Sequence, residues 1–192
     1  MTVTGTSSGI GRTTTEYLLK QGDIVVATLR KPEVLAELQR QYPADKLLVL
    51  KLDVSKPEDV SNAFVKAKEA FGRIDVVFNN AGYGILAEVE AGDEGVARSM
   101  FDTNFWGAIT VSKEAVKFFR DINEPSGGRL IVNSSYAAMQ SNALFSFYSA
   151  SKAGECVPLS FGGKHGSVTH SILQRWSPCM KHWLSSLIRN GT

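Results

Sequence analysis

The 192-residue sequence has few of the features that mark secreted, membrane or nucleic-acid-binding proteins. Its two cysteines, Cys156 and Cys179, fall outside any CxxC spacing, which argues against a disulfide framework and indicates a reducing compartment. No apolar run approaches the length of about 18 residues that a membrane span needs, and no basic and apolar leader opens the chain. The net charge of +2 gives no basic footprint for nucleic acid. A soluble, cytoplasmic protein with no nucleic-acid or membrane partner is therefore expected.

The sequence does have an ordinary globular composition, with 43% apolar and 21% charged residues in a length that suits one domain. Nearly continuous apolar runs of strand length occupy residues 23–29, 46–54, 74–80 and 128–134. Such runs are typical of parallel strands that are covered on both faces. Segments of helical period follow at residues 12–21, 33–41, 57–71 and 95–121. This alternation predicts a Rossmann-like α/β fold, a doubly wound parallel sheet with helices on both faces.

The composition changes after Ala153. Residues 1–153 contain 17 basic and 18 acidic side chains, whereas residues 154–192 contain four basic and one acidic. All three histidines and both cysteines lie in this last segment. We expect a nucleotide-binding domain over residues 1–153 and a divergent tail over 154–192 without a clear strand, although residues 180–190 could form a short helix.

A glycine-rich stretch, TGTSSGIG at residues 4–11, lies between a short strand and a helix. Glycine allows a tight turn and a close approach of the backbone to a pyrophosphate, which the N–H groups and dipole of a helix N-terminus favour. The alternative is an ordinary turn rich in glycine and serine. The placement between strand and helix favours the cofactor interpretation. A second local signal, Ser55 and Glu58 at capping-box spacing with Pro57 between them, predicts where a later helix starts.

The residues after the second predicted strand indicate which dinucleotide would bind. An acid there would hold a ribose 2′-hydroxyl, whereas an arginine accommodates a 2′-phosphate. The sequence has Arg30 and Lys31, with no acid before Glu33, and therefore predicts NADP(H) over NAD(H). The alternative is a pair of solvated surface cations. Asp53 follows the third strand, where it could accept from the adenine amine or cap the next turn.

Six short motifs occur in one order along the first part of the chain. They are TGTSSGIG at 4–11, LDV at 52–54, NNAG at 79–82, the asparagine of MFDTNFWGAI at Asn104, IVNSS at 131–135 and YSASK at 148–152. In this order and at these spacings they resemble the short-chain dehydrogenase/reductase family. The resemblance covers about residues 1–153. It implies an oxidoreductase that transfers a hydride between a nicotinamide and a carbonyl or alcohol substrate.

The resemblance implies the catalytic residues Asn104, Ser135, Tyr148 and Lys152. Ser135 is preferred to Ser134 because the family's serine lies thirteen positions before its tyrosine. Hydride transfer to a carbonyl leaves an alkoxide that needs a proton. Tyr148 and Lys152 are four residues apart, so on a helix they share a face and the ammonium would favour the phenolate. Ser135 would hydrogen-bond the carbonyl oxygen of the substrate. In the family, an asparagine at the position of Asn104 anchors a water molecule of the proton relay.

The cofactor-binding residues follow from the same resemblance: the glycine loop for the pyrophosphate, the NNAG motif beside the ribose and an aspartate facing the adenine. The predicted set is Gly5, Ser7, Ser8, Gly9, Ile10, Gly11, Arg30, Asp53, Val54, Asn80, Ala81, Gly82, Asn104, Tyr148 and Lys152. Alternatives remain, since a tyrosine–lysine pair can simply decorate a helix surface and a mid-helix asparagine can serve a buried hydrogen bond. No metal site is predicted, because the tail histidines and cysteines form no convincing ligand framework.

Two departures from the family pattern lead to competing expectations. The chain begins only three residues before Thr4, which shortens the first strand. After Ala153 the family's sixth strand and Pro-Gly turn are not recognisable, and Pro158 interrupts the helix that begins near Tyr148. We therefore expect the last strands of the fold to be lost, together with part of the surface through which the family usually forms homo-oligomers. The alternatives to an active enzyme are a non-catalytic nucleotide-binding protein, an inactive truncated relative, or a product of a shifted reading frame or unusual splice.

Overall fold

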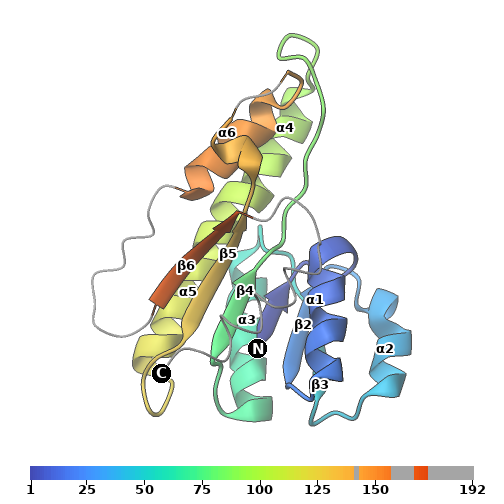
Figure 1. Ribbon diagram of the computed structural model, residues 1–192, viewed down its shortest axis with the longest axis vertical. Helices are drawn as coiled ribbons and strands as arrows, with labels where there is room; N and C mark the ends of the chain where they lie inside the picture. Colours follow the sequence, from blue (N-terminus) through green and yellow to red (C-terminus); the bar gives the residue numbers. More distant parts are fainter. Residues whose placement is uncertain (141–142, 157–166, 173–192) are drawn as a thin grey trace.

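The structure, a computed structural model, describes residues 1–140, 143–156 and 167–172. Within these residues six parallel strands form one sheet in the order β3-β2-β1-β4-β5-β6 (Figure 1). The strands are β1 (Thr2–Thr4), β2 (Val25–Leu29), β3 (Leu47–Lys51), β4 (Val76–Asn79), β5 (Arg129–Ser134) and β6 (Ser167–Ile172). The predicted doubly wound α/β fold is confirmed.

Helical segments connect the strands. They are α1 (Gly9–Lys20), η1 (Pro32–Leu35), α2 (Ala36–Gln41), α3 (Pro57–Phe71), α4 (Glu94–Phe101), η2 (Asp102–Gly107), α5 (Ala108–Asp121), η3 (Tyr136–Ala138) and α6 (Ser146–Cys156). The single helix predicted over residues 95–121 is therefore α4 and α5 joined through η2, which has π-helical hydrogen bonding. Within the described part of the chain, no helix is long and apolar enough to cross a bilayer.

Two hydrophobic clusters among the described residues cover the two faces of the sheet. On one face α3 and α5 pack through residues such as Phe64 and Phe118, whose ring centroids lie 5.9 Å apart. On the other face Leu18 of α1 and Leu38 of α2 pack against Phe78 of β4. Successive side chains of a strand point to opposite faces, so strands that contribute to both clusters are apolar at most positions. This explains the continuous apolar runs in the sequence.

The order of the strands reverses between β1 and β4. From β1 the chain winds outward through β2 and β3, then returns to the other side of β1 and continues through β4 and β5 (Figure 1). In such sheets the loops at the carboxyl ends of the two central strands diverge, and a crevice opens between them. The glycine loop after β1 and the NNAG motif after β4 both lie at this crevice.

Two sequence predictions about local structure are wrong. The first is that no strand follows Ala153: residues 167–172 pair in parallel with β5 over its whole length. This strand has the sequence SVTHSI and is largely polar, so its hydrophobic pattern is weak. It is held in the sheet by pairing of its backbone N–H and C=O groups with the edge of β5. The helix expected at residues 180–190 lies outside the described residues.

The second concerns α3, which does begin at Pro57 as predicted, but without the capping box from which the prediction was made. Lys56 is the N-cap residue, and no side chain caps the helix. The hydroxyl and N–H of Ser55 instead donate to Asp53 Oδ1 over 2.7 and 3.1 Å. A local bond to a carboxylate two residues away has competed successfully with the cap.

Candidate active site

The glycine loop folds as a tight turn between β1 and α1. Gly5 and Gly9 have φ angles of +69° and +56°, in the left-handed region that glycine adopts at little cost. Ser8 is the N-cap of α1, and its side chain makes no capping hydrogen bond. The N–H groups of the first turn are consequently left to interact with an anion.

Gly11 is needed for a different reason, the lack of space. A methyl group on Gly11 would lie 2.4 Å from the carbonyl oxygen of Gly5 and 2.6 Å from Asn80 Nδ2. Helix α1 therefore begins in direct contact with the loop that follows β4. The three glycines of the motif thus have separate roles: Gly5 and Gly9 in the turn, and Gly11 in the close packing behind it.

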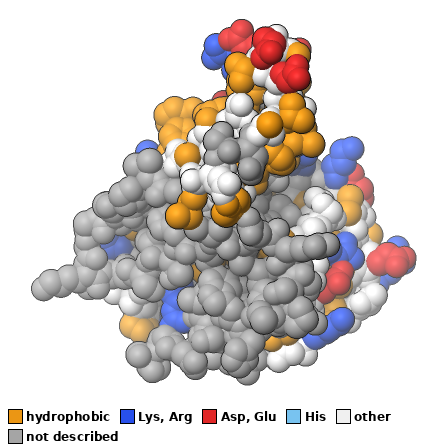
Figure 2. All heavy atoms as spheres, turned by 45° about the horizontal axis from the view of Figure 1, so that its top comes forward, with side chains coloured by type: hydrophobic (Ala, Val, Ile, Leu, Met, Phe, Trp, Pro, Cys, Tyr) orange, Lys and Arg blue, Asp and Glu red, His pale blue; other side chains and the backbone are white. Residues whose placement is uncertain are grey.

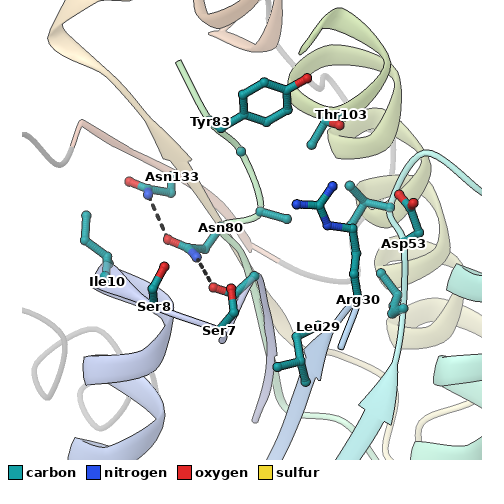
Figure 3. A pocket seen from close by; sticks show the side chains of 16 residues that line it. Ser7, Ser8, Ile10, Leu29, Arg30, Asp53, Asn80, Tyr83, Thr103 and Asn133 are labelled. Carbon is teal, nitrogen blue, oxygen red and sulfur yellow. Dashed lines mark hydrogen bonds between the residues drawn. The ribbon is translucent and has the colours of Figure 1, made fainter. Parts of the chain in front are cut away.

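A hydrogen-bond network ties the two loops of the crevice together. Thr4 Oγ1 accepts from the backbone N–H groups of Asn80 and Ala81, each at 2.9 Å. The amide of Asn80 donates to the carbonyl oxygen of Thr4 at 2.9 Å. It also accepts from Asn133 Nδ2 of β5 at 2.9 Å (Figure 3). Among the described residues, the buried Asn133 Oδ1 has no partner.

A cavity of about 490 Å³ lies at the carboxyl ends of β1 to β4. Eleven of the fifteen predicted cofactor residues line it: Gly5, Ser7, Ser8, Gly9, Ile10, Arg30, Asp53, Val54, Asn80, Ala81 and Gly82. Gly11, Asn104, Tyr148 and Lys152 are not among the lining residues. Sequence reasoning missed Leu29, Leu52, Tyr83, Thr103 and Asn133, which also line it. Leu29 is the last residue of one predicted strand and Leu52 lies near the end of another, so the rule that sites lie at the carboxyl ends of strands could have identified both.

Arg30 and Asp53 lie at one end of this cavity. The exposed side chain of Arg30 points into it (Figure 3), and this guanidinium forms no ion pair within the described part of the chain. Asp53 binds Ser55 through Oδ1, which is the turn-capping role that the sequence left open as an alternative. The predicted contact of Asp53 with adenine stays a prediction.

Beyond the cavity, the loop at residues 82–84 brings together three of the four predicted catalytic residues. A methyl group on Gly82 would lie 3.0 Å from Asn104 Oδ1 and 3.4 Å from Lys152 Nζ. One on Gly84 would lie 3.2 Å from Cδ2 of the Tyr148 ring. The side chains of Asn104, Tyr148 and Lys152 are therefore placed around one short stretch of backbone that has no side chains at these positions.

Asn104 is fully buried within the π-helical segment η2. Its Oδ1 accepts from the N–H of Tyr83 at 3.0 Å, and its Nδ2 donates to the carbonyl oxygen of Tyr83 at 2.8 Å and to Ser151 Oγ at 3.1 Å. The asparagine thus holds the 82–84 loop against α6. Single π-helical turns inside α-helices occur frequently at functional sites.

Ser135 lies just after β5, where its side chain caps η3. Its Oγ accepts from the N–H of Ala137 at 3.2 Å, which leaves the hydroxyl proton for another acceptor. No hydrogen bond in the described residues joins Ser135 to Tyr148. The structure places both residues at the carboxyl end of β5 and the start of α6, as the motif spacing predicts.

Sequence reasoning missed the residue that contacts Lys152 most closely. Lys152 Nζ donates to Glu155 Oε2 at 2.6 Å and to the carbonyl oxygen of Asn133 at 2.9 Å. Both side chains of the ion pair are buried, with exposed fractions of 5% and 3%. Burial raises the pKa of Glu155 above its ordinary value, and the charge of Lys152 opposes this rise. The spacing of three residues on a helix was the signal that could have revealed the pair.

The comparisons identify the family. A sequence model of the short chain dehydrogenases matches residues 1–157. The chain belongs to this family. An uncharacterized oxidoreductase of Schizosaccharomyces pombe is 37% identical to it over 150 residues, which are 78% of this chain and 49% of that protein. The NADPH-dependent 1-acyldihydroxyacetone phosphate reductase of Saccharomyces cerevisiae is 33% identical over 153 residues, 79% of this chain and 50% of the reductase.

Solved structures agree with this membership. A short-chain dehydrogenase of Streptomyces avermitilis superposes with a TM-score of 0.74 at 33% identity, over 80% of this chain and 55% of that one. The chain is therefore a member of a family of oxidoreductases that bind a nicotinamide cofactor. It spans about half the length of the relatives that it matches.

The first prediction concerns the close packing at Gly11. Replacing Gly11 by Ala should lower the free energy of unfolding by about 1–3 kcal/mol, because the methyl group has no room beside the Gly5 carbonyl. Urea unfolding measures the change, with Lys20→Ala on the exposed end of the same helix as the control. Helix propensity alone predicts the opposite sign, by up to about 1 kcal/mol, so a stabilised Gly11→Ala variant would contradict the close packing.

The second prediction concerns the buried ion pair. Lys152→Met leaves the Glu155 carboxylate buried and unpaired, so the free energy of unfolding at pH 7 should fall by about 3–5 kcal/mol. Because the raised pKa of Glu155 favours its protonated form in the folded chain, this deficit should shrink as the pH is lowered toward the ordinary value of 4.5.

Urea unfolding between pH 4.5 and pH 8 measures this dependence. The double variant Lys152→Met/Glu155→Gln should recover most of the loss, since no charge remains buried. Lys117→Met, which removes an exposed partner of Glu114, is the control and should change stability by less than about 0.5 kcal/mol. A deficit that is constant with pH would show that Glu155 does not carry a buried charge.

Proposed function

We propose that this chain is an NADP(H)-dependent oxidoreductase that transfers a hydride between the nicotinamide and a carbonyl or alcohol substrate. The observation that carries the proposal is the continuity of the site. The cavity that begins at the glycine loop ends at Gly82 and Tyr83, and this same loop contacts Asn104, Lys152 and Tyr148. A nucleotide in the cavity would extend directly to the predicted catalytic residues.

The residues of the cavity fit a dinucleotide phosphate. The N-terminus of α1 with Ser7 and Ser8 would hold the pyrophosphate, and Arg30 would bind a 2′-phosphate through charge-assisted hydrogen bonds. Asp53 and Val54 lie where an adenine would be placed. The unpartnered Asn133 Oδ1 would accept a hydrogen bond from a hydroxyl group. Residues 1–153 form most of the proposed nucleotide-binding unit, and the described part of the tail adds the end of α6 and the edge strand β6 to it.

The catalytic step needs a proton donor at the substrate oxygen. When bound, the nicotinamide supplies or accepts the hydride. The Tyr148 hydroxyl would donate its proton to the oxygen that becomes negative, while Ser135 Oγ donates a hydrogen bond to the same oxygen. Lys152 would stabilise the tyrosinate that results, and Asn104 fixes the loop at which the cavity meets these groups. The tyrosine is regenerated by a proton from solvent.

A second candidate function is nucleotide binding without turnover. The observation that favours it is the ion pair with Glu155, which neutralises the lysine that should act on Tyr148. Both functions require the cofactor to bind, and thermal unfolding with NADPH or NADH tests this shared requirement. A melting temperature that NADPH raises selectively would support either function, because a ligand that binds only the folded chain stabilises it by mass action. Indifference to both dinucleotides would contradict both functions.

The third prediction separates these two functions. Tyr148→Phe removes the proton donor but leaves the ring against Gly84, so reductase turnover should fall at least about a thousandfold while NADPH binding is unchanged. Carbonyl-dependent oxidation of NADPH and titration calorimetry measure the two quantities. Tyr17→Phe on α1 is the matched control. Turnover that persists in Tyr148→Phe would refute the catalytic assignment, and its absence in the unchanged chain would favour nucleotide binding alone.

The fourth prediction concerns cofactor choice. Arg30→Ala should weaken NADPH binding about 10- to 100-fold and leave NADH binding unchanged, because only NADPH offers a 2′-phosphate to the guanidinium. Dissociation constants from calorimetry at one fixed salt concentration measure the effect. Arg40→Ala removes an exposed arginine that pairs with Glu37 outside the cavity and should affect neither cofactor. An equal loss for both dinucleotides would contradict recognition of the 2′-phosphate by Arg30.

A further inference from the structure

The catalytic lysine of the proposed site has a negatively charged partner that the proposed chemistry does not use. We propose that Glu155 is a positioning residue that limits the effect of Lys152 on Tyr148 by neutralising its charge. The proposal deepens the proposed function, because it assigns a control of catalytic strength to the same site.

The contacts of Lys152 show how closely the two charges are matched. An ammonium group has three donors, and two of them are directed to Glu155 Oε2 and to the carbonyl oxygen of Asn133. The remaining donor faces the narrow space at Gly82, next to Asn104 Oδ1. The orientation of the ammonium group is therefore set from one side by a carboxylate at 2.6 Å and from the other by the end of β5.

The effect of this pair on Tyr148 follows from its net charge. A lone buried ammonium group would attract a phenolate strongly, since the low local dielectric increases the interaction. A carboxylate in contact with the ammonium turns the single charge into a dipole, whose field falls off faster with distance. In this chain Lys152 belongs to an ion pair of zero net charge, so a tyrosinate at Tyr148, four residues earlier on α6, should be stabilised less than it would be by a lone ammonium group.

Among the residues that the structure describes, the elements around this pair contribute no second charge to it. In the described residues the only ionic interaction of Glu155 is with Lys152. The groups that face the pair from other elements are neutral: the Asn133 carbonyl of β5, the Asn104 amide of η2 and the backbone of Gly82. The charge state of Glu155 is consequently the main variable that sets the field of Lys152.

The test is a spectroscopic titration of Tyr148 in the full chain without cofactor or substrate. Tyrosinate absorbance is followed from pH 6 to pH 11, and the Tyr148 contribution is isolated by subtracting the curve of the same chain carrying Tyr148→Phe. In Glu155→Gln this contribution should develop about one pH unit lower than in the unchanged chain, a tenfold change in ionisation constant. Lys152→Gln/Glu155→Gln should return it close to the unchanged chain.

Glu155→Met, which is also uncharged but cannot accept a hydrogen bond, is the second variant. The same shift in both variants would assign the effect to the charge rather than to the hydrogen bond. An unchanged Tyr148 curve in Glu155→Gln would overturn the proposal, since Lys152 would then have lost its own proton instead. Loss of the cooperative unfolding transition in both variants would also overturn it, because Glu155 would then serve the fold.

The titration distinguishes this proposal from the proposed function. It requires neither NADPH nor a carbonyl substrate, so a chain without turnover still gives the result. If the chain is active, the rate of alcohol oxidation below pH 8 should rise about tenfold in Glu155→Gln, with its pH profile moved in the same direction as the tyrosinate curve. A uniform change in rate without movement of the profile would count against the proposal.

Discussion

The contact between the loop after β1 and the loop after β4 is the constraint on which the site depends. Thr4 supplies one hydroxyl oxygen to two backbone N–H groups, and Asn80 returns a hydrogen bond to the Thr4 carbonyl oxygen. A parallel sheet opens a crevice at its switch point, but the crevice alone would not fix the two loops relative to each other. The network does so, and Gly11 permits it because no side chain separates α1 from Asn80. The positions of the cavity and of the loop at residues 82–84 then follow from this one junction.

Much of the fold and the nucleotide part of the site could be predicted because the signals are local. Apolar runs, helical periods and the glycine spacing each lie within a few residues, and the confirmed sheet and the lining of the cavity follow from them. The missed features are long-range or compete locally. Leu52 and Asn133 line the cavity because of the order in which the strands are arranged in the sheet. Ser55 forms a hydrogen bond with Asp53 instead of capping the helix. Strand β6 forms through backbone pairing with β5, which its polar sequence does not indicate. The importance of Glu155 depends on burial, which helix spacing does not reveal.

The distribution of charge along the proposed site argues that binding and turnover are separable in this chain. At the nucleotide end the Arg30 guanidinium is exposed to the cavity and has no ion-pair partner in the described part of the chain, so its full charge is available to a phosphate. At the other end the charge of Lys152 is buried and balanced by Glu155. Phosphate recognition is a ground-state interaction and needs the first charge, whereas stabilisation of a tyrosinate needs the second. The two charges of the proposed site therefore have different surroundings, one open to the cavity and one paired inside the protein. If the proposed function holds, we expect a change in the charge of Glu155 to alter the rate of the chemical step and to leave the affinity for the cofactor unchanged.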